Sequence, residues 1–120
     1  MLRILTVDDS VAMRQLVSAT LSGAGYEVVQ AGSAREALQI AAEHPVDLVL
    51  TDVNMPQMDG IALVRELRGL TAYRHKPLLF LTTESSGSRK LEGREAGANG
   101  WLMKPFNDER LLATIARFLK

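Results

Sequence analysis

Five side chains that could do chemistry stand at the ends of short apolar runs: Asp8, Asp9, Asp52, Thr82 and Lys104. Three carboxylates brought together repel one another, and one of them would take up a proton unless a cation compensates their charge. Magnesium suits such a group, because it binds one or two carboxylates, keeps several waters and accepts phosphate oxygens as further ligands. A carboxylate beside a bound phosphoryl group can attack it and form an acyl phosphate. The hydroxyl of Thr82 and the ammonium of Lys104 could then stabilise the phosphoryl oxygens. This set of residues indicates phosphoryl transfer, with Asp52 as the nucleophile.

The elements that must position these residues are short strands separated by helices. Five apolar runs are predicted strands: Leu2 to Val7, Tyr26 to Gln30, Asp47 to Thr51, Leu78 to Leu81 and Trp101 to Met103. Caps and apolar periodicity predict helices over residues 10–23, from the capping box Ser33-Ala34-Arg35-Glu36 onward, over 60–68, over 85–97 and from Asn107 to the end. The fourth helix should be the least stable, because Gly87 and Gly93 each cost about 1 kcal/mol relative to alanine.

Alternating strands and helices predict an α/β fold, a doubly wound parallel sheet with helices on both faces. In such sheets, ligands bind beyond the carboxyl ends of the strands, where the strand order reverses. If the order is 2-1-3-4-5, the first and third strands are neighbours, and Asp8, Asp9 and Asp52 converge on one crevice. We predict a single domain over residues 1–120, with this crevice as the functional site.

Composition excludes several other classes of function. The 14 basic and 14 acidic residues give a formal net charge of zero, so no positive field attracts nucleic acid or anionic lipid. Cysteine is absent, which excludes disulfides, a thiolate nucleophile and a zinc ribbon. The apolar run at the N-terminus is too short for a signal peptide, and no segment has membrane-spanning length. We expect a cytoplasmic protein that neither binds nucleic acid nor inserts into a membrane.

Each candidate residue also has a purely structural interpretation. Asp8 and Asp9 could favour the positive end of the first helix, and Asp52 could be an ordinary loop residue. A surface lysine such as Lys104 is usually solvated. These separate interpretations do not explain why all the candidate residues stand at the ends of predicted strands. Asp59, which precedes Gly60, is interpreted as a helix N-cap only.

Several motifs together closely resemble the receiver domains of two-component response regulators, and most of all the single-domain chemotaxis regulators. They are Asp8-Asp9, Asp52 with Asn54-Met55-Pro56, Met58-Asp59-Gly60, Thr82, and Gly100 through Lys104-Pro105-Phe106. The resemblance covers essentially the whole chain. It implies a flavodoxin-like (βα)5 fold with strand order 2-1-3-4-5.

The resemblance implies roles for the residues of the crevice. Asp52 would accept a phosphoryl group from a histidine kinase or a small acyl phosphate. Mg²⁺ would be bound by Asp9, Asp52 and the backbone carbonyl of Asn54, with Asp8 assisting through water. Lys104 would contact the phosphoryl group.

The resemblance also implies a conformational switch. Thr82 would move toward the phosphoryl group while the aromatic ring at position 101 turns inward; the family usually has Tyr or Phe there, so Trp101 is a departure. Glu84 and Asn54 occupy positions that tune hydrolysis of the acyl phosphate. The peptide between Lys104 and Pro105 would be cis. The output surface would comprise the fourth helix, the fifth strand and the fifth helix.

We therefore predict a stand-alone response regulator that catalyses only its own phosphorylation and dephosphorylation, a switch rather than an enzyme. Its expected partners are a histidine kinase as phosphodonor and a downstream protein such as a flagellar motor switch component, with a phosphatase as a further candidate. A monomer is expected.

Four alternatives use related chemistry or the same fold. A phosphorelay intermediate or a phosphate sink would use the same site. A Mg²⁺ phosphohydrolase of the haloacid dehalogenase type needs a second aspartate two residues after the nucleophile, where this chain has Asn54. A degenerate receiver would act without phosphorylation, but all the expected site residues are present.

Overall fold

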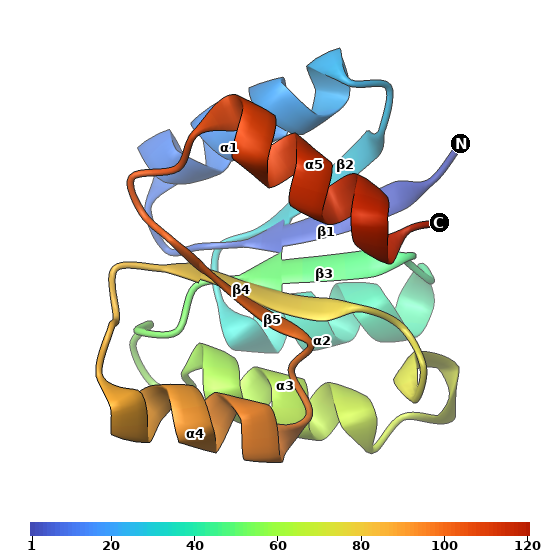
Figure 1. Ribbon diagram of the computed structural model, residues 1–120. Helices are drawn as coiled ribbons and strands as arrows, with labels where there is room; N and C mark the ends of the chain where they lie inside the picture. The colour runs from blue at the N-terminus through green and yellow to red at the C-terminus, as the bar shows by residue number, and fades with distance from the viewer.

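Five parallel strands form one sheet in the order β2-β1-β3-β4-β5 in the computed structural model, which describes residues 1–120 (Figure 1). The strands are β1 (Arg3–Val7), β2 (Glu27–Ala31), β3 (Leu48–Thr51), β4 (Leu78–Thr82) and β5 (Gly100–Met103). The predicted α/β fold class and strand order are confirmed. Because β1 and β3 are neighbours, the residues after them leave the sheet side by side at its carboxyl edge.

Helices cover both faces of this sheet. They are α1 (Val11–Gly23), α2 (Ala34–Glu43), α3 (Gly60–Arg68), the short 3-10 helix η1 (Thr71–Tyr73), α4 (Gly87–Ala96) and α5 (Asp108–Phe118). Figure 1 shows α1 and α5 together on one face and α2, α3 and α4 on the other. None of these helices has the length and apolar composition needed to cross a bilayer.

Each face of the sheet has its own core. The larger core, of 18 buried residues, lies under α2, α3 and α4 and includes Leu5, Val7 and Phe80. The smaller, of nine residues, lies under α1 and α5 and includes Ile4 and Leu79. Successive residues of a strand point to opposite faces, so a sheet covered on both sides requires continuous apolar strands. This double burial explains the apolar runs in the sequence.

Several element boundaries differ slightly from those predicted. Tyr26 lies outside β2, because its amide donates to the carbonyl of Leu21 and closes the end of α1. Helix α4 begins at Gly87 rather than at residue 85, because Ser86 is its N-cap and accepts from the amide of Arg89. The three-residue helix η1 was not predicted, since so short a segment has no apolar periodicity.

Gly93 lies where α4 packs most closely on the sheet. A Cβ atom at this position would be 2.7 Å from the ring of Phe80 and 3.1 Å from the ring of Trp101. The sequence indicated only the low helix propensity of this glycine. In the structure, the missing side chain makes room for the two rings, so Gly93 sets how closely α4 approaches β4 and β5. That α4 is the least stable helix stays a prediction.

Candidate functional site

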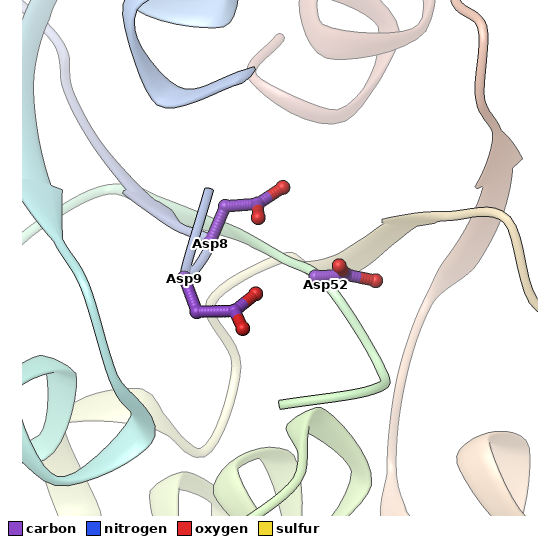
Figure 2. Close-up of side chains that lie close together, drawn as sticks. All are labelled: Asp8, Asp9 and Asp52. Atoms are coloured by element: carbon purple, nitrogen blue, oxygen red, sulfur yellow. The ribbon is translucent and has the colours of Figure 1, made fainter. Parts of the chain in front are cut away.

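Three carboxylates meet at the carboxyl edge of the sheet, at the ends of two neighbouring strands (Figure 2). Asp8 and Asp9 follow β1, and Asp52 follows β3, with Val7 and Thr51 paired directly before them. Oxygen atoms of the three side chains all lie within 4.8 Å of one another. Asp8 is 4% exposed and Asp52 9%, whereas Asp9 is open to solvent. The convergence expected from strand order is therefore present.

Lys104 adds a cation to this cluster from the end of β5. Its Nζ donates to Oδ2 of Asp8 at 2.7 Å and to Oδ2 of Asp52 at 3.1 Å. Burial by itself would lower the pKa of Lys104, but the hydrogen bonds and charges of the two carboxylates outweigh it and leave the pKa raised. The side chain, only 10% exposed, is thus held as an ammonium between two anions.

Backbone amides fix the other oxygens of the same two carboxylates. Oδ1 of Asp8 accepts from the amide of Ser10 at 2.9 Å, and Oδ1 of Asp52 accepts from the amide of Val53 at 2.7 Å. In each of these two carboxylates, one oxygen therefore accepts a hydrogen bond from a peptide amide and the other accepts one from Lys104. The side chain of Asp9 makes no hydrogen bond within the chain, so its oxygens are available to a ligand.

Gly60 allows the loop after Asp52 to fold tightly against α3. A Cβ atom on Gly60 would lie 1.9 Å from the carbonyl oxygen of Asp52, a distance that no real side chain could adopt. Because Gly60 has no Cβ atom, the loop can approach closely, and the amide of Gly60 donates to the carbonyl of Val53 at 2.8 Å. The sequence placed Gly60 in a motif but gave no sign of this contact, which depends on the three-dimensional path of the loop.

Thr82 is completely buried at the end of β4. Its hydroxyl oxygen accepts from the amide of Glu84 at 3.1 Å, and it makes no hydrogen bond to Asp52. The amide of Lys104 donates to the carbonyl of Thr82, which ties the ends of β4 and β5 together. The structure thus places Thr82 near the cluster but directs its hydroxyl to the following loop.

Trp101 lies on β5, on the side of the sheet that α4 covers. Its indole Nε1 donates to the carbonyl of Glu84 at 3.0 Å, and its ring meets that of Phe80 edge to face, with centroids 5.1 Å apart. It is half-buried and does not contact the carboxylates. The indole N–H gives this chain a hydrogen bond that a phenylalanine ring could not make.

The remaining predicted residues lie around the cluster. Asn54 is exposed on the loop two residues after Asp52 and makes no side-chain hydrogen bond. The peptide between Lys104 and Pro105 is cis, as the resemblance implied.

Sequence reasoning missed two arginines that bind around the site. Nη1 of Arg14 donates to the carbonyl of Asp8 at 2.7 Å. Asp59 accepts from the amide of Ala62 as the predicted N-cap, and its Oδ2 also accepts from Nη2 of Arg89 at 2.9 Å. Burial would raise the pKa of Asp59, but these two hydrogen bonds and the charge of Arg89 bring it below its ordinary value. No local pattern could reveal either arginine contact, because each depends on chain folding.

Comparisons with known proteins agree on one family. The family model described as a response regulator receiver domain matches residues 4–116. The solved structure of the chemotaxis protein CheY4 of Vibrio cholerae is 50% identical, superimposes with a TM-score of 0.95, and covers 99% of each chain. A response regulator protein from Burkholderia multivorans is 44% identical over all of this chain and 96% of its own, with a TM-score of 0.83.

Curated relatives include longer proteins. The response regulator MprA of Mycolicibacterium vanbaalenii is 42% identical over 98% of this chain and 50% of its own length. The response regulator protein FleR of Pseudomonas aeruginosa is 40% identical over 96% of this chain and 24% of its own. The chain spans half or less of the length of these relatives. It belongs to the response regulator receiver domains, the signalling switches of two-component systems.

Proposed function

We propose that Asp52 accepts a phosphoryl group from a histidine kinase, with Mg²⁺ bound beside it, and that this modification changes the surface formed by α4, β5 and α5. The observation that carries the proposal is the position of Lys104, whose ammonium contacts Asp8 and Asp52 while Asp9 remains open to solvent. A cation held beside a potential nucleophile stabilises a negatively charged group that is transferred to it.

The donor set fits magnesium. Carboxylate oxygens within 4.8 Å of one another are hard ligands of the kind that Mg²⁺ prefers. Asp9, Asp52 and the backbone carbonyl of Asn54 would hold the ion, and Asp8 would assist through water. When bound, the ion supplies positive charge that compensates the phosphoryl oxygens.

In the proposed transfer, a carboxylate oxygen of Asp52 attacks the phosphorus atom. An O–P bond forms while the P–N bond of the phosphohistidine breaks, and the imidazole nitrogen keeps the electron pair. The other carboxylate oxygen stays on its hydrogen bond, since Val53 supplies a fixed amide. Lys104 then moves from Asp52 to a phosphoryl oxygen, a short shift because its Nζ is already 3.1 Å from the carboxylate.

The signal would leave the site through Thr82. Its buried hydroxyl would move to donate to the phosphoryl group, and this movement would change its contact with the amide of Glu84. The carbonyl of Glu84 accepts from Trp101, so the change would reach that ring. The similarity to CheY4 supports output of the chemotaxis type, through a protein such as a flagellar motor switch component. A histidine kinase that uses ATP would act on this protein in the cytoplasm.

The test is intact-protein mass spectrometry after treatment with acetyl phosphate, with and without Mg²⁺. We expect a gain of one phosphoryl group that needs Mg²⁺ and is lost in Asp52→Asn. Asp108→Asn is the matched control, because Asp108 is exposed in the first turn of α5. No gain in the native chain would refute phosphorylation, and an unchanged gain in Asp52→Asn would refute the assignment of the acceptor.

A further inference from the structure

The two ends of α4 are held by two arginines, and the two sets of contacts differ in kind. Arg68, at the end of α3, binds around the C-terminal end of α4. Arg89, in the first turn of α4, binds at the N-terminal end. The difference between them suggests which end of this helix can move.

The C-terminal end is fixed to uncharged groups. The guanidinium of Arg68 donates to the carbonyls of Gly97, Tyr73 and Lys76 at 2.6 to 2.9 Å, and to Oδ1 of Asn99 at 2.7 Å. Gly97 ends α4 with a φ of 114°, and a Cβ there would lie 2.8 Å from the side chain of Arg68. This guanidinium therefore joins the end of α4 to the segments that lead into β4 and β5, through several hydrogen bonds at once.

The N-terminal end is held by ion pairs. Arg89 contacts three carboxylates: Asp59 at 2.9 Å, Glu92 at 3.2 Å and Glu84 at 3.6 Å. Its side chain is 25% exposed, so these contacts are weaker than buried ones and depend on charge. Asp59 is the N-cap of α3, and Glu84 belongs to the loop after β4. Arg89 thus connects the loop that follows Asp52 to the loop that follows Thr82.

Glu84 is in contact with Thr82, Trp101 and Arg89. Its amide donates to the hydroxyl of Thr82, its carbonyl accepts from Nε1 of Trp101, and its carboxylate pairs with Arg89. In the function proposed above, the Thr82 hydroxyl moves toward Asp52, and the first of these bonds is the one that such a movement alters. The loop of residues 83–86 is then held in its original place by the two that remain.

We propose that Arg89 is a positioning residue that holds this loop and the first turn of α4 in the unphosphorylated arrangement, and that α4 moves about the end anchored by Arg68. The inference rests on the function proposed above. An interaction present in only one of two states shifts the equilibrium between them by its own free energy. Removal of Arg89 therefore favours the switched arrangement and, by linkage, the phosphorylated protein.

The test compares Arg89→Met and Arg68→Met with the native full chain by hydrogen exchange without a phosphodonor, and by initial rates of labelling with acetyl phosphate and Mg²⁺. Arg89→Met should speed exchange in residues 84–91. It should also raise the labelling rate about two- to fivefold, the population shift expected from the loss of a partly exposed ion pair. Arg68→Met should instead speed exchange around residues 96–99. Arg65→Met is the control, because Arg65 is exposed on α3 and makes no ion pair.

Two results would overturn the inference. One is exchange in residues 84–91 of Arg89→Met that matches the native chain. The other is a labelling rate in that variant equal to or below the native rate, because Arg89 would then not favour the unphosphorylated state. A native chain that takes no label at all would refute the proposed function itself, and the exchange measurement separates that failure from the others.

Discussion

The Nζ of Lys104 lies 3.1 Å from Oδ2 of Asp52, a residue 52 positions earlier in the chain. The same ammonium is 2.7 Å from Asp8, so the two most buried carboxylates of the site share one cation. Asp9 is left with an uncompensated charge beside them. The cluster is thus short of positive charge before any ligand arrives, which favours the binding of a further cation.

Removing Lys104 should destabilise the protein, because it leaves two buried carboxylates facing each other. We expect Lys104→Ala to lower the free energy of unfolding by about 1–3 kcal/mol in urea titrations without Mg²⁺. The variant should still be labelled on Asp52. Phosphorylation should then not alter the surroundings of Trp101, so the fluorescence of Trp101 should stay constant on labelling. Lys90→Ala is the control, since Lys90 is exposed and makes no ion pair. Equal stability of the native chain and Lys104→Ala would contradict the role of Lys104 as the compensating cation.

Asp9 should contribute to Mg²⁺ binding more than to stability, since its side chain makes no internal hydrogen bond. We expect Asp9→Asn to weaken Mg²⁺ affinity by roughly tenfold or more, as measured by calorimetric titration. Its unfolding midpoint without Mg²⁺ should stay the same or rise, because one repulsive charge is removed. Asp47→Asn, at the opposite edge of the sheet near Arg3, should leave the affinity unchanged. An unaltered affinity in Asp9→Asn would exclude Asp9 as a ligand.

The positions of the carboxylates could be predicted from the sequence because each depends on local patterns. Apolar runs mark the strands, and parallel strands bring their carboxyl ends to one edge. The convergence of Asp8, Asp9 and Asp52 also needed the strand order, which the family resemblance implied. Lys104 is a similar case, since it ends the last apolar run.

The contacts of the arginines could not be predicted in this way. Arg89 and Asp59 are 30 positions apart, and Arg68 and Gly97 are 29 apart. A charged residue on an exposed helix usually indicates only a solvated surface, and the partners become apparent once the helices are packed. The contact of Gly60 with the Asp52 carbonyl was missed for the same reason, because it depends on the path of a loop.

The pair of Asp59 and Arg89 should make stability depend on pH in the acid range. The pKa of Asp59 lies below its ordinary value of 3.8, so its contribution is complete above that value and is lost as the pH falls through the lowered pKa. Asp59→Asn keeps an N-cap oxygen but removes the charge. We expect it to be less stable at pH 7 by about 0.5–1 kcal/mol, a small value because the pair is partly exposed.

That difference between Asp59→Asn and the native chain should shrink as the pH falls below 3.8 and in high salt, which screens the pair. Paired urea titrations over the acid range would measure it. A difference that persists unchanged at the lowest pH would mean that the substitution acts through the cap and not through Arg89.

The two glycines of α4 should respond in opposite directions to substitution by alanine. Alanine favours a helix by about 1 kcal/mol over glycine. A Cβ on Gly87 meets nothing within 4 Å, so Gly87→Ala should stabilise the protein by up to that amount. A Cβ on Gly93 would press on the rings of Phe80 and Trp101, and overpacking of this kind costs about 1–3 kcal/mol.

Gly93→Ala should therefore lower the unfolding midpoint although it raises helix propensity, and it should alter the fluorescence of Trp101, the only tryptophan. Thermal unfolding of the two variants, followed by circular dichroism, measures both effects. If Gly93→Ala were as stabilising as Gly87→Ala, the rings would have moved aside at little cost. The close approach of α4 to β4 and β5 would then be adjustable, and the size of residue 93 would not set the position of this helix.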